Sequence, residues 1–209
     1  MRNLRAHKMI QFSPINPNSS FSELLEQEQR EFAIYQHYDF LDYKKQRLAF
    51  LEKQLNAPSV KALYDYVGIN KPKIGLFAGS FNPFHKGHYN VLQKAEKLFD
   101  KVIIAFGKNP SKDVHTWPVP KTILNRQITA YNSLLTDHVE SFGYEVTVVR
   151  GLRNSTDFQY EQNQYRYIQE LKPDIKIINI FCDKEFEHIS SSGIRTLEKY
   201  DKHHHYLLD

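Results

Sequence analysis

From Lys73 onward, short apolar runs alternate with longer stretches whose apolar residues recur at helical spacing. The apolar runs have the length and continuous hydrophobicity of strands buried on both faces, and they occupy residues 73–79, 101–107, 145–151 and 176–182. The helical pattern occupies residues 88–99, 121–135 and 157–171. Because right-handed crossovers through helices join parallel strands, this alternation predicts an α/β fold with a parallel sheet and helices on both faces. In such a sheet the ligand binds at the carboxyl ends of the strands.

The pattern before Lys73 is helical, and it predicts a separate N-terminal extension over residues 1–72, ahead of a main domain over residues 73–209. Ser20 and Glu23 have the spacing of a capping box, and neither proline nor glycine occurs from there to Leu55. We expect one long helix or a helical hairpin broken near residues 38–42. Pro58 is expected to end it, and a short second helix closes at Gly68. The aromatic residues of this region pack it onto the main domain or form a partner surface.

Composition narrows the function classes. The chain has 209 residues, 41% of them hydrophobic and 25% charged, and a net charge of +4. That charge is too small to favour nucleic acid as a partner, and it is compatible with a phosphate-rich small substrate. The apolar runs are too short to cross a membrane, and the N-terminus lacks the apolar region of a signal peptide. The one cysteine, Cys182, indicates a reducing cytoplasm and a buried structural thiol.

The turn "GSFNPFHKGH", residues 79–88, joins the first predicted strand to the first helix of the main domain. Gly79 allows a ligand to approach the backbone, and Ser80 places a hydroxyl at the strand end. His85 and His88, one turn apart, face the same space, where the helix N-terminus offers free N–H groups. A metal site, a phosphate site and plain turn chemistry are the alternatives. Two histidines without a third ligand nearby make a poor zinc site, so we favour phosphate.

Four motifs carry a resemblance to a known family over residues 73–199. "GSFNPFHKGH" resembles the HxGH signature of the nucleotidyltransferase superfamily. "KLFDKVIIAFGKNPSK" is similar to the second strand and lysine loop of phosphopantetheine adenylyltransferase, and "RGLRNSTDFQYE" resembles the arginine motif of that family. "ISSSGIR" resembles the ISSS motif of the superfamily. The resemblance implies a Rossmann-like nucleotidyltransferase fold and an enzyme that moves AMP from ATP to a phosphorylated acceptor, releasing pyrophosphate.

The resemblance also implies roles for individual residues. The catalytic candidates are His88, Lys112 and Ser80. Acceptor binding falls to Ser80, Lys112 and Arg150. The residues implied to bind ATP are Gly79, Ser80, Phe81, His85, His88, Gly151, Arg153, Glu161, Ser190, Ser191 and Ser192. Within this set, Glu161 is expected to lie near Arg153. Mg²⁺ is expected to arrive with ATP, without a metal site of the protein's own.

Plainer interpretations of these motifs stay open at this point. Arg150 and Arg153 could form surface ion pairs, "ISSS" could be only a helix cap, and Lys112 an ordinary turn lysine. Asp157 and Tyr160 are expected to support the arginine loop, and Trp117 to anchor the loop after Lys112. The end of the chain, residues 199–209, is polar, and we expect it to be frayed with its three histidines in solvent rather than on a metal.

The acceptor side departs from the family pattern. Residues 136–149 are too few for the usual strand and helix, which predicts that one strand of the family's five-stranded sheet is missing. Gln164 and Arg166 give the expected acceptor wall a more polar and basic character. The most favoured acceptor is 4′-phosphopantetheine. The alternatives are nicotinamide or nicotinate mononucleotide and, in a different class, an inactive nucleotide-binding module. We also expect a homo-oligomer to which the N-terminal helices contribute.

Overall fold

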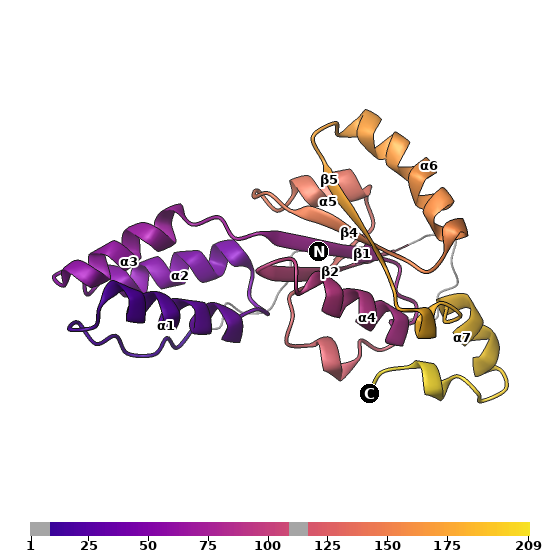
Figure 1. The fold of residues 1–209 in the computed structure, drawn as a ribbon, viewed down its shortest axis with the longest axis horizontal. Coiled ribbons are helices and arrows are strands. Elements are labelled where there is room, and N and C mark those ends of the chain that lie inside the picture. The colour runs from indigo at the N-terminus through magenta and orange to yellow at the C-terminus, as the bar shows by residue number, and fades with distance from the viewer. Residues whose placement is uncertain (1–8, 109–116) are drawn as a thin grey trace. The chain divides into compact units, whose positions relative to one another are not determined.

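The computed structural model describes residues 9–108 and 117–209. The chain divides into two compact units, with the boundary between Lys71 and Pro72. The first unit is helical, and the second combines a parallel sheet with helices (Figure 1). Among the described residues, no helix is both long and apolar enough to cross a membrane.

Three helices form the N-terminal unit: α1 (Phe21–Ile34), α2 (Phe40–Glu52) and α3 (Pro58–Ile69). The predicted capping box of α1 is confirmed, because Ser20 and Glu23 bond to each other's backbone N–H groups. The hairpin alternative is also confirmed. The chain leaves α1 after Ile34, and the Asp39 carboxylate caps α2 by accepting N–H bonds from Leu41 and Asp42.

The predicted short second helix is confirmed as α3, but the roles expected for Pro58 and Gly68 were wrong. Pro58 is the first residue of α3, and Gly68 lies inside that helix, which ends one residue later. The physical reason is that proline suits the first helical position, where its missing N–H has no partner to lose.

The aromatic residues of the N-terminal unit pack largely against one another inside it. Phe12 contacts Tyr35, Tyr43 and Phe50 at centroid distances of 5.3–5.9 Å. The Arg47 guanidinium lies over the Phe12 and Phe50 rings, and its Nε donates to Glu28 Oε2 at 2.6 Å. Many of these rings therefore stabilise the unit itself.

The second unit has a five-stranded, all-parallel sheet in the order β3-β2-β1-β4-β5. The strands are β1 (Ile74–Gly79), β2 (Lys101–Gly107), β3 (Ile128–Tyr131), β4 (Thr147–Leu152) and β5 (Lys176–Phe181). The helices are α4 (Lys86–Ala95), α5 (Leu135–Glu140), α6 (Ser155–Leu171) and α7 (Ser191–Glu198). Helix α4 lies on one face of the sheet, and α5 and α6 on the other (Figure 1). The predicted fold class is confirmed.

The chain winds outward from β1 through β2 to β3 and then crosses to β4 on the other side of β1. The winding direction therefore reverses between β1 and β4. In open parallel sheets, this reversal point is where a crevice forms outside the carboxyl ends of the strands.

The helix predicted over residues 121–135 was wrong. This segment forms a short 3₁₀ turn (Lys121–Ile123), strand β3 and the start of α5. The strand pairs with β2 through the register Ile104↔Ile128, and the β-branched Ile128 and Thr129 fit a pleated surface. The predicted loss of a strand was also wrong, because β3 had been assigned to that helix. All five strands are present, and the segment before β4 is short because helix α5 has only six residues.

The core of the second unit lies around β1, β2 and β4 and against α4. Its buried members are Phe77, Phe81, Phe84, Val91, Leu92, Ala95, Val102, Ile104, Ile123, Val149, Ile180 and Cys182. The expected burial of Cys182 is confirmed, and burial raises the pKa of its thiol.

The C-terminal segment is anchored to this unit, so the expectation of a frayed tail was wrong. Leu207 forms an antiparallel bridge with His85, and Lys86 Nζ donates to the His205 carbonyl at 2.6 Å. The Lys121 N–H donates to the Asp209 carbonyl at 3.1 Å, and Leu208 packs on the core. Backbone contacts hold this segment, and polar side chains in a sequence do not reveal such contacts.

Candidate active site

A pocket of about 290 Å³ opens at the carboxyl ends of β1 and β4, where the winding of the sheet reverses. The β1–α4 loop, the β4–α6 loop and the start of α7 form its walls. Every predicted site residue within the described part of the chain lines it: Gly79, Ser80, Phe81, His85, His88, Arg150, Gly151, Arg153, Glu161, Ser190, Ser191 and Ser192. Lys112 lies outside the described residues.

The two histidines of the β1–α4 loop cap helix α4 for each other. His85 Nδ1 accepts the His88 N–H at 3.4 Å, and His88 Nδ1 accepts the His85 N–H at 3.3 Å. Their rings stack at a centroid distance of 3.6 Å. A neutral imidazole that accepts at Nδ1 carries its proton on Nε2, so each ring keeps an Nε2–H donor.

Both histidines are held in the neutral form. Burial lowers the pKa of His85 to about 3, and the positive charge of Arg153 adds to this effect. Burial, the neighbouring His85 and Arg153 together lower the pKa of His88 well below its usual range. At neutral pH the pair therefore offers hydrogen-bond donors and carries no charge.

The end of β1 bends sharply at Phe81, whose φ of 44° lies in the left-handed region. Such a conformation costs a non-glycine residue on the order of 1–3 kcal/mol and persists when packing over-determines it. Here the Phe81 ring contacts Phe77, Phe84 and Phe106 at centroid distances of 4.8, 5.1 and 5.3 Å.

The Phe81 ring gives a structural reason for a glycine at position 79. A Cβ at this position would lie 2.7 Å from the Phe81 ring. The ring therefore disfavours a side chain here, and the approach of a ligand to Gly79, which lines the pocket, stays a prediction.

Two arginines at the end of β4 form ion pairs with the first two turns of α6. Arg150 pairs with Glu161 through Nε at 2.7 Å and Nη2 at 2.5 Å, and its Nη1 donates to the Ala78 carbonyl at 2.7 Å. Arg153 donates from Nε and Nη2 to the two carboxylate oxygens of Asp157, both at 2.8 Å. Burial opposes ionisation of Asp157, but these bonds keep its pKa below the usual value. The guanidinium groups are therefore held in place before any ligand binds.

Glu161 was expected near Arg153, and it lines the same pocket but forms its ion pair with Arg150. Asp157 and Glu161 lie one turn apart on the same face of α6, so each carboxylate reaches a different arginine. The expectation that Asp157 supports the arginine loop is confirmed by its bonds to the Arg153 backbone and side chain. Both arginines form ion pairs, as the plainer alternative expected, and both also line the pocket.

The serines at the start of α7 both cap the helix and line the pocket. Ser190 Oγ accepts the Gly193 N–H at 3.0 Å, and Ser191 Oγ donates to the Pro83 carbonyl at 3.0 Å. The two interpretations of "ISSS" are therefore compatible, because a capped helix N-terminus is also an anion site.

Arg195 also lines the pocket and donates from Nη1 to the Asn82 carbonyl, and sequence reasoning assigned it no role. Its position four residues after Ser191, on the same face of α7, is the feature of the sequence that could have placed it in the pocket.

The charged residues that line the pocket are the arginines Arg150, Arg153 and Arg195 and the carboxylates Asp157 and Glu161. Both carboxylates are paired with arginine in this pocket. The arrival of Mg²⁺ with ATP stays a prediction. Neither Gln164 nor Arg166 is among the described residues that line this pocket, so their part in an acceptor wall stays a prediction.

Comparison with known proteins shows that the chain is a nucleotidyltransferase. The family model described as Cytidylyltransferase-like matches residues 76–197, more than half of the chain, and the chain belongs to that family. Within it, the chain belongs with the phosphopantetheine adenylyltransferases. It is 34% identical over 139 residues to the phosphopantetheine adenylyltransferase of Mycoplasma capricolum subsp. capricolum, covering 62% of this chain and 99% of that protein.

Another relative and a solved structure complete the comparison. The phosphopantetheine adenylyltransferase of Cytophaga hutchinsonii is 35% identical over 138 residues, covering 62% of this chain and 91% of that protein. A bifunctional NMN adenylyltransferase/ADP ribose pyrophosphatase from Francisella tularensis, solved with AMP and a manganese ion, matches with a TM-score of 0.40 and 18% identity. That match covers 63% of this chain and only 42% of the solved chain.

Proposed function

We propose that this enzyme transfers AMP from ATP to 4′-phosphopantetheine, giving dephospho-coenzyme A and pyrophosphate. The observation that carries the proposal is the convergence of three of the four sequence motifs on one pocket, in a chain 34% identical to a phosphopantetheine adenylyltransferase over 99% of that protein. The sequence alternatives, a mononucleotide acceptor and an inactive module, are not needed to account for these facts.

The reaction is a displacement at phosphorus. An oxygen of the acceptor phosphate forms a bond to the α-phosphorus of ATP, and the bond from that phosphorus to the α,β-bridging oxygen breaks. Pyrophosphate leaves with the electron pair. Because the nucleophile is already an anion, the step needs alignment and charge stabilisation rather than a base. Neutral histidines that donate hydrogen bonds meet this requirement.

Each residue's role is part of the proposal. His85 and His88 donate from Nε2 to phosphate oxygens of ATP, His88 at the reacting phosphate, and Ser80 donates from the end of β1. Arg153 binds the β,γ end of ATP together with the start of α7, formed by Ser190, Ser191 and Ser192. Their position on the pocket wall supports these roles.

On the acceptor side, we propose that Arg150 binds the acceptor phosphate. Its bidentate bond to Glu161 orients a guanidinium group that can bind a phosphate by the same geometry. Lys112 is proposed, on its motif alone, to bridge the two substrates. We propose that the Mg²⁺ ion arrives bound to ATP.

The proposal is tested by measuring pyrophosphate release with ATP, Mg²⁺ and 4′-phosphopantetheine, with dephospho-coenzyme A identified by mass. His88→Ala should lower kcat by at least about 10²-fold, the usual effect of losing one donor to a developing charge. His205→Asn, a change on the exposed part of the C-terminal segment, serves as the matched control.

Other acceptors separate the two halves of the proposal. Release with nicotinamide mononucleotide but not with phosphopantetheine would contradict the acceptor and leave the chemistry standing. ATP binding without turnover on any acceptor would contradict adenylyl transfer itself.

We also propose that the chain works as a homo-oligomer. Helix α6 has 17 residues and none is buried, and its exposed apolar side chains include Phe158, Tyr165, Tyr167 and Leu171. The N-terminal unit exposes Ile34 and Ile69 in the same way, which supports a contribution from its helices. Light scattering after gel filtration tests this: Tyr167→Glu should shift the wild-type oligomer toward monomer, and a monomeric wild type would contradict the proposal.

We place the enzyme in the cytoplasm, on the ground that its single cysteine, Cys182, is a free and buried thiol. Microscopy of the protein fused to a fluorescent domain at the N-terminus checks this placement.

A further inference from the structure

The C-terminal segment, residues 201–209, holds a group of side chains that the proposed function does not use. Helix α7 ends in a Schellman motif, in which the Lys202 N–H donates to the Leu197 carbonyl and the Asp201 N–H to the Glu198 carbonyl, both at 3.0 Å. Asp201 occupies the left-handed position of this motif, with a φ of 55°. The backbone therefore fixes where the Asp201 carboxylate begins.

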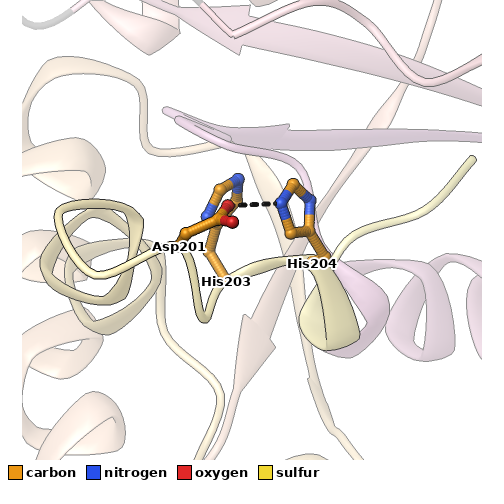
Figure 2. A group of neighbouring side chains, drawn as sticks. All are labelled: Asp201, His203 and His204. Carbon is orange, nitrogen blue, oxygen red and sulfur yellow. Dashed lines mark hydrogen bonds and ion pairs between the residues drawn. The ribbon is translucent and has the colours of Figure 1, made fainter.

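Asp201, His203 and His204 each offer one ligand atom, and these atoms lie within 4.8 Å of one another (Figure 2). His204 Nε2 is 2.8 Å from Asp201 Oδ1, an interaction that the dashed line in Figure 2 marks. The three side chains come from two adjacent turns of the chain. The sequence alone favoured histidines in solvent, but the anchored segment holds these two beside a carboxylate.

His203 adds a second, independent observation. Its side chain is only 9% exposed, and its ring packs edge-on against Trp117 at a centroid distance of 5.4 Å. Its Nδ1 atom is buried and has no hydrogen-bond partner among the described residues. An unsatisfied buried nitrogen costs free energy, and a metal ion is one of the groups that explain such an atom.

We propose that Asp201, His203 and His204 bind one divalent transition-metal ion of the zinc class. Two imidazoles and one carboxylate are ligands that zinc prefers, and three protein ligands leave a fourth position for water. Mg²⁺ prefers oxygen ligands, so this site is distinct from the metal that accompanies ATP.

The geometry requires only a local closing motion. Zn–N and Zn–O bonds of about 2.0–2.1 Å in a tetrahedron place ligand atoms roughly 3.3 Å apart. The Asp201–His204 pair is already closer than that, so the metal replaces a hydrogen bond between two exposed side chains. A ring nitrogen of His203 lies within 4.8 Å of the other two ligand atoms and would shift inward to complete the site.

The site bears on the candidate active site through the backbone. Leu207, three residues after His204, is bridged to His85, which lines the pocket and caps α4. Lys86 adds a bond to the His205 carbonyl. A bound metal ion would therefore hold in place the segment that lies against the histidine loop.

The test titrates metal-free full-length protein with Zn²⁺ by calorimetry, in the presence of millimolar Mg²⁺. We expect one high-affinity equivalent in the wild type and a loss of at least about tenfold in affinity in His204→Asn and Asp201→Asn, since each removes a ligand. Asparagine also tolerates the left-handed conformation at residue 201, which keeps the Schellman motif. His205→Asn is the matched control and should change the affinity less than twofold.

Two results would overturn the proposal. Unchanged affinity in His204→Asn and Asp201→Asn would place the zinc elsewhere, for example on His85 and His88. Equal losses in all three variants would show unspecific binding to a histidine-rich segment. Co²⁺ absorption guards against misfolded variants: wild-type protein should show the intense visible bands of a tetrahedral site, and their absence contradicts the proposal without any variant.

Discussion

One arginine–glutamate pair from each unit makes an instructive comparison, because the two pairs have similar lengths and differ in what surrounds them. Arg47 and Glu28 meet at 2.6 Å in the N-terminal unit, with side chains 0% and 9% exposed. Arg150 and Glu161 meet at 2.5 Å in the second unit, with side chains 21% and 14% exposed. The first pair is covered by the Phe12 and Phe50 rings, whereas the second lines the pocket.

The difference separates a structural ion pair from one that is available to a ligand. Around Arg47, the Tyr43 hydroxyl donates to Glu28 at 2.8 Å and the aromatic rings exclude water, so the charges depend on each other. Around Arg150, the pocket leaves the guanidinium on an open wall. The same interaction therefore stabilises one unit and, by our proposal, prepares the other for binding.

The largest expected effect comes from breaking the buried pair. Glu28→Ala leaves the Arg47 charge buried without its carboxylate and should lower the free energy of unfolding by about 3–5 kcal/mol. Urea denaturation followed by circular dichroism measures it. Glu26→Ala, which breaks the exposed pair with Arg30, is the matched control and should cost less than about 1 kcal/mol. Equal costs would show that Arg47 and Glu28 are not electrostatically dependent on each other.

Arg150→Ala tests the pair at the pocket. We expect kcat/KM for phosphopantetheine to fall by about 10²–10³-fold, or roughly 3–4 kcal/mol, because a preoriented guanidinium is lost. Stability should change much less than in Glu28→Ala, since water can reach Glu161. Steady-state kinetics measures kcat/KM for Arg150→Ala, and Arg30→Ala, which breaks an exposed pair in the other unit, is the control variant. A stability loss with full activity in the folded fraction would make this pair structural as well.

A change of pH probes the histidines beside the second pair. His85 has its pKa lowered to about 3, so the unfolded chain binds its proton more readily than the folded one. The contribution to stability is therefore present above about pH 6.5 and is lost as the pH falls toward 3, with a loss of about 2–3 kcal/mol by pH 4.5. Denaturation curves at a series of pH values measure this, and His85→Asn should reduce the slope of the profile between pH 6.5 and 4.5, while His88, whose pKa is also lowered, keeps part of that slope. An identical slope in that variant would assign the effect to other groups.

The smallest effect is expected at Ser191, which joins the serine wall to the histidine loop. Ser191→Ala removes the bond to the Pro83 carbonyl and should cost about 0.5–1.5 kcal/mol, the usual value of one such bond. Thermal denaturation gives the stability, and KM for ATP reports the displacement of the wall. Ser133→Ala, on an exposed loop, is a suitable control. A normal KM with reduced stability would limit Ser191 to a structural role.

Local features of the sequence were sufficient for much of this description. The buried strands and the capping box are encoded over a few residues, so their patterns survive in the fold. Strand β3 was missed because its apolar residues, with those on either side, also fit a helical period. Its pairing with β2 decided the outcome, and pairing is not visible in a local pattern.

In the candidate site, too, local patterns were predictable and long-range contacts were not. The motifs identified which residues meet in the pocket, but not which carboxylate pairs with which arginine, because that depends on how β4 and α6 pack. The anchoring of Leu207 to His85 connects positions far apart in the chain through backbone groups. The role of Lys112 remains a prediction from its motif.

The contacts of α7 have a further consequence for the choice of nucleotide. Ser191 and Arg195 both bond to carbonyls of the β1–α4 loop, so the N-terminal ends of α4 and α7 are tied at a set separation. If one helix end binds the α-phosphate and the other the γ-phosphate, their fixed separation selects for a nucleotide with three phosphates. A nucleoside diphosphate would contact only one of the two helix ends, whatever its base.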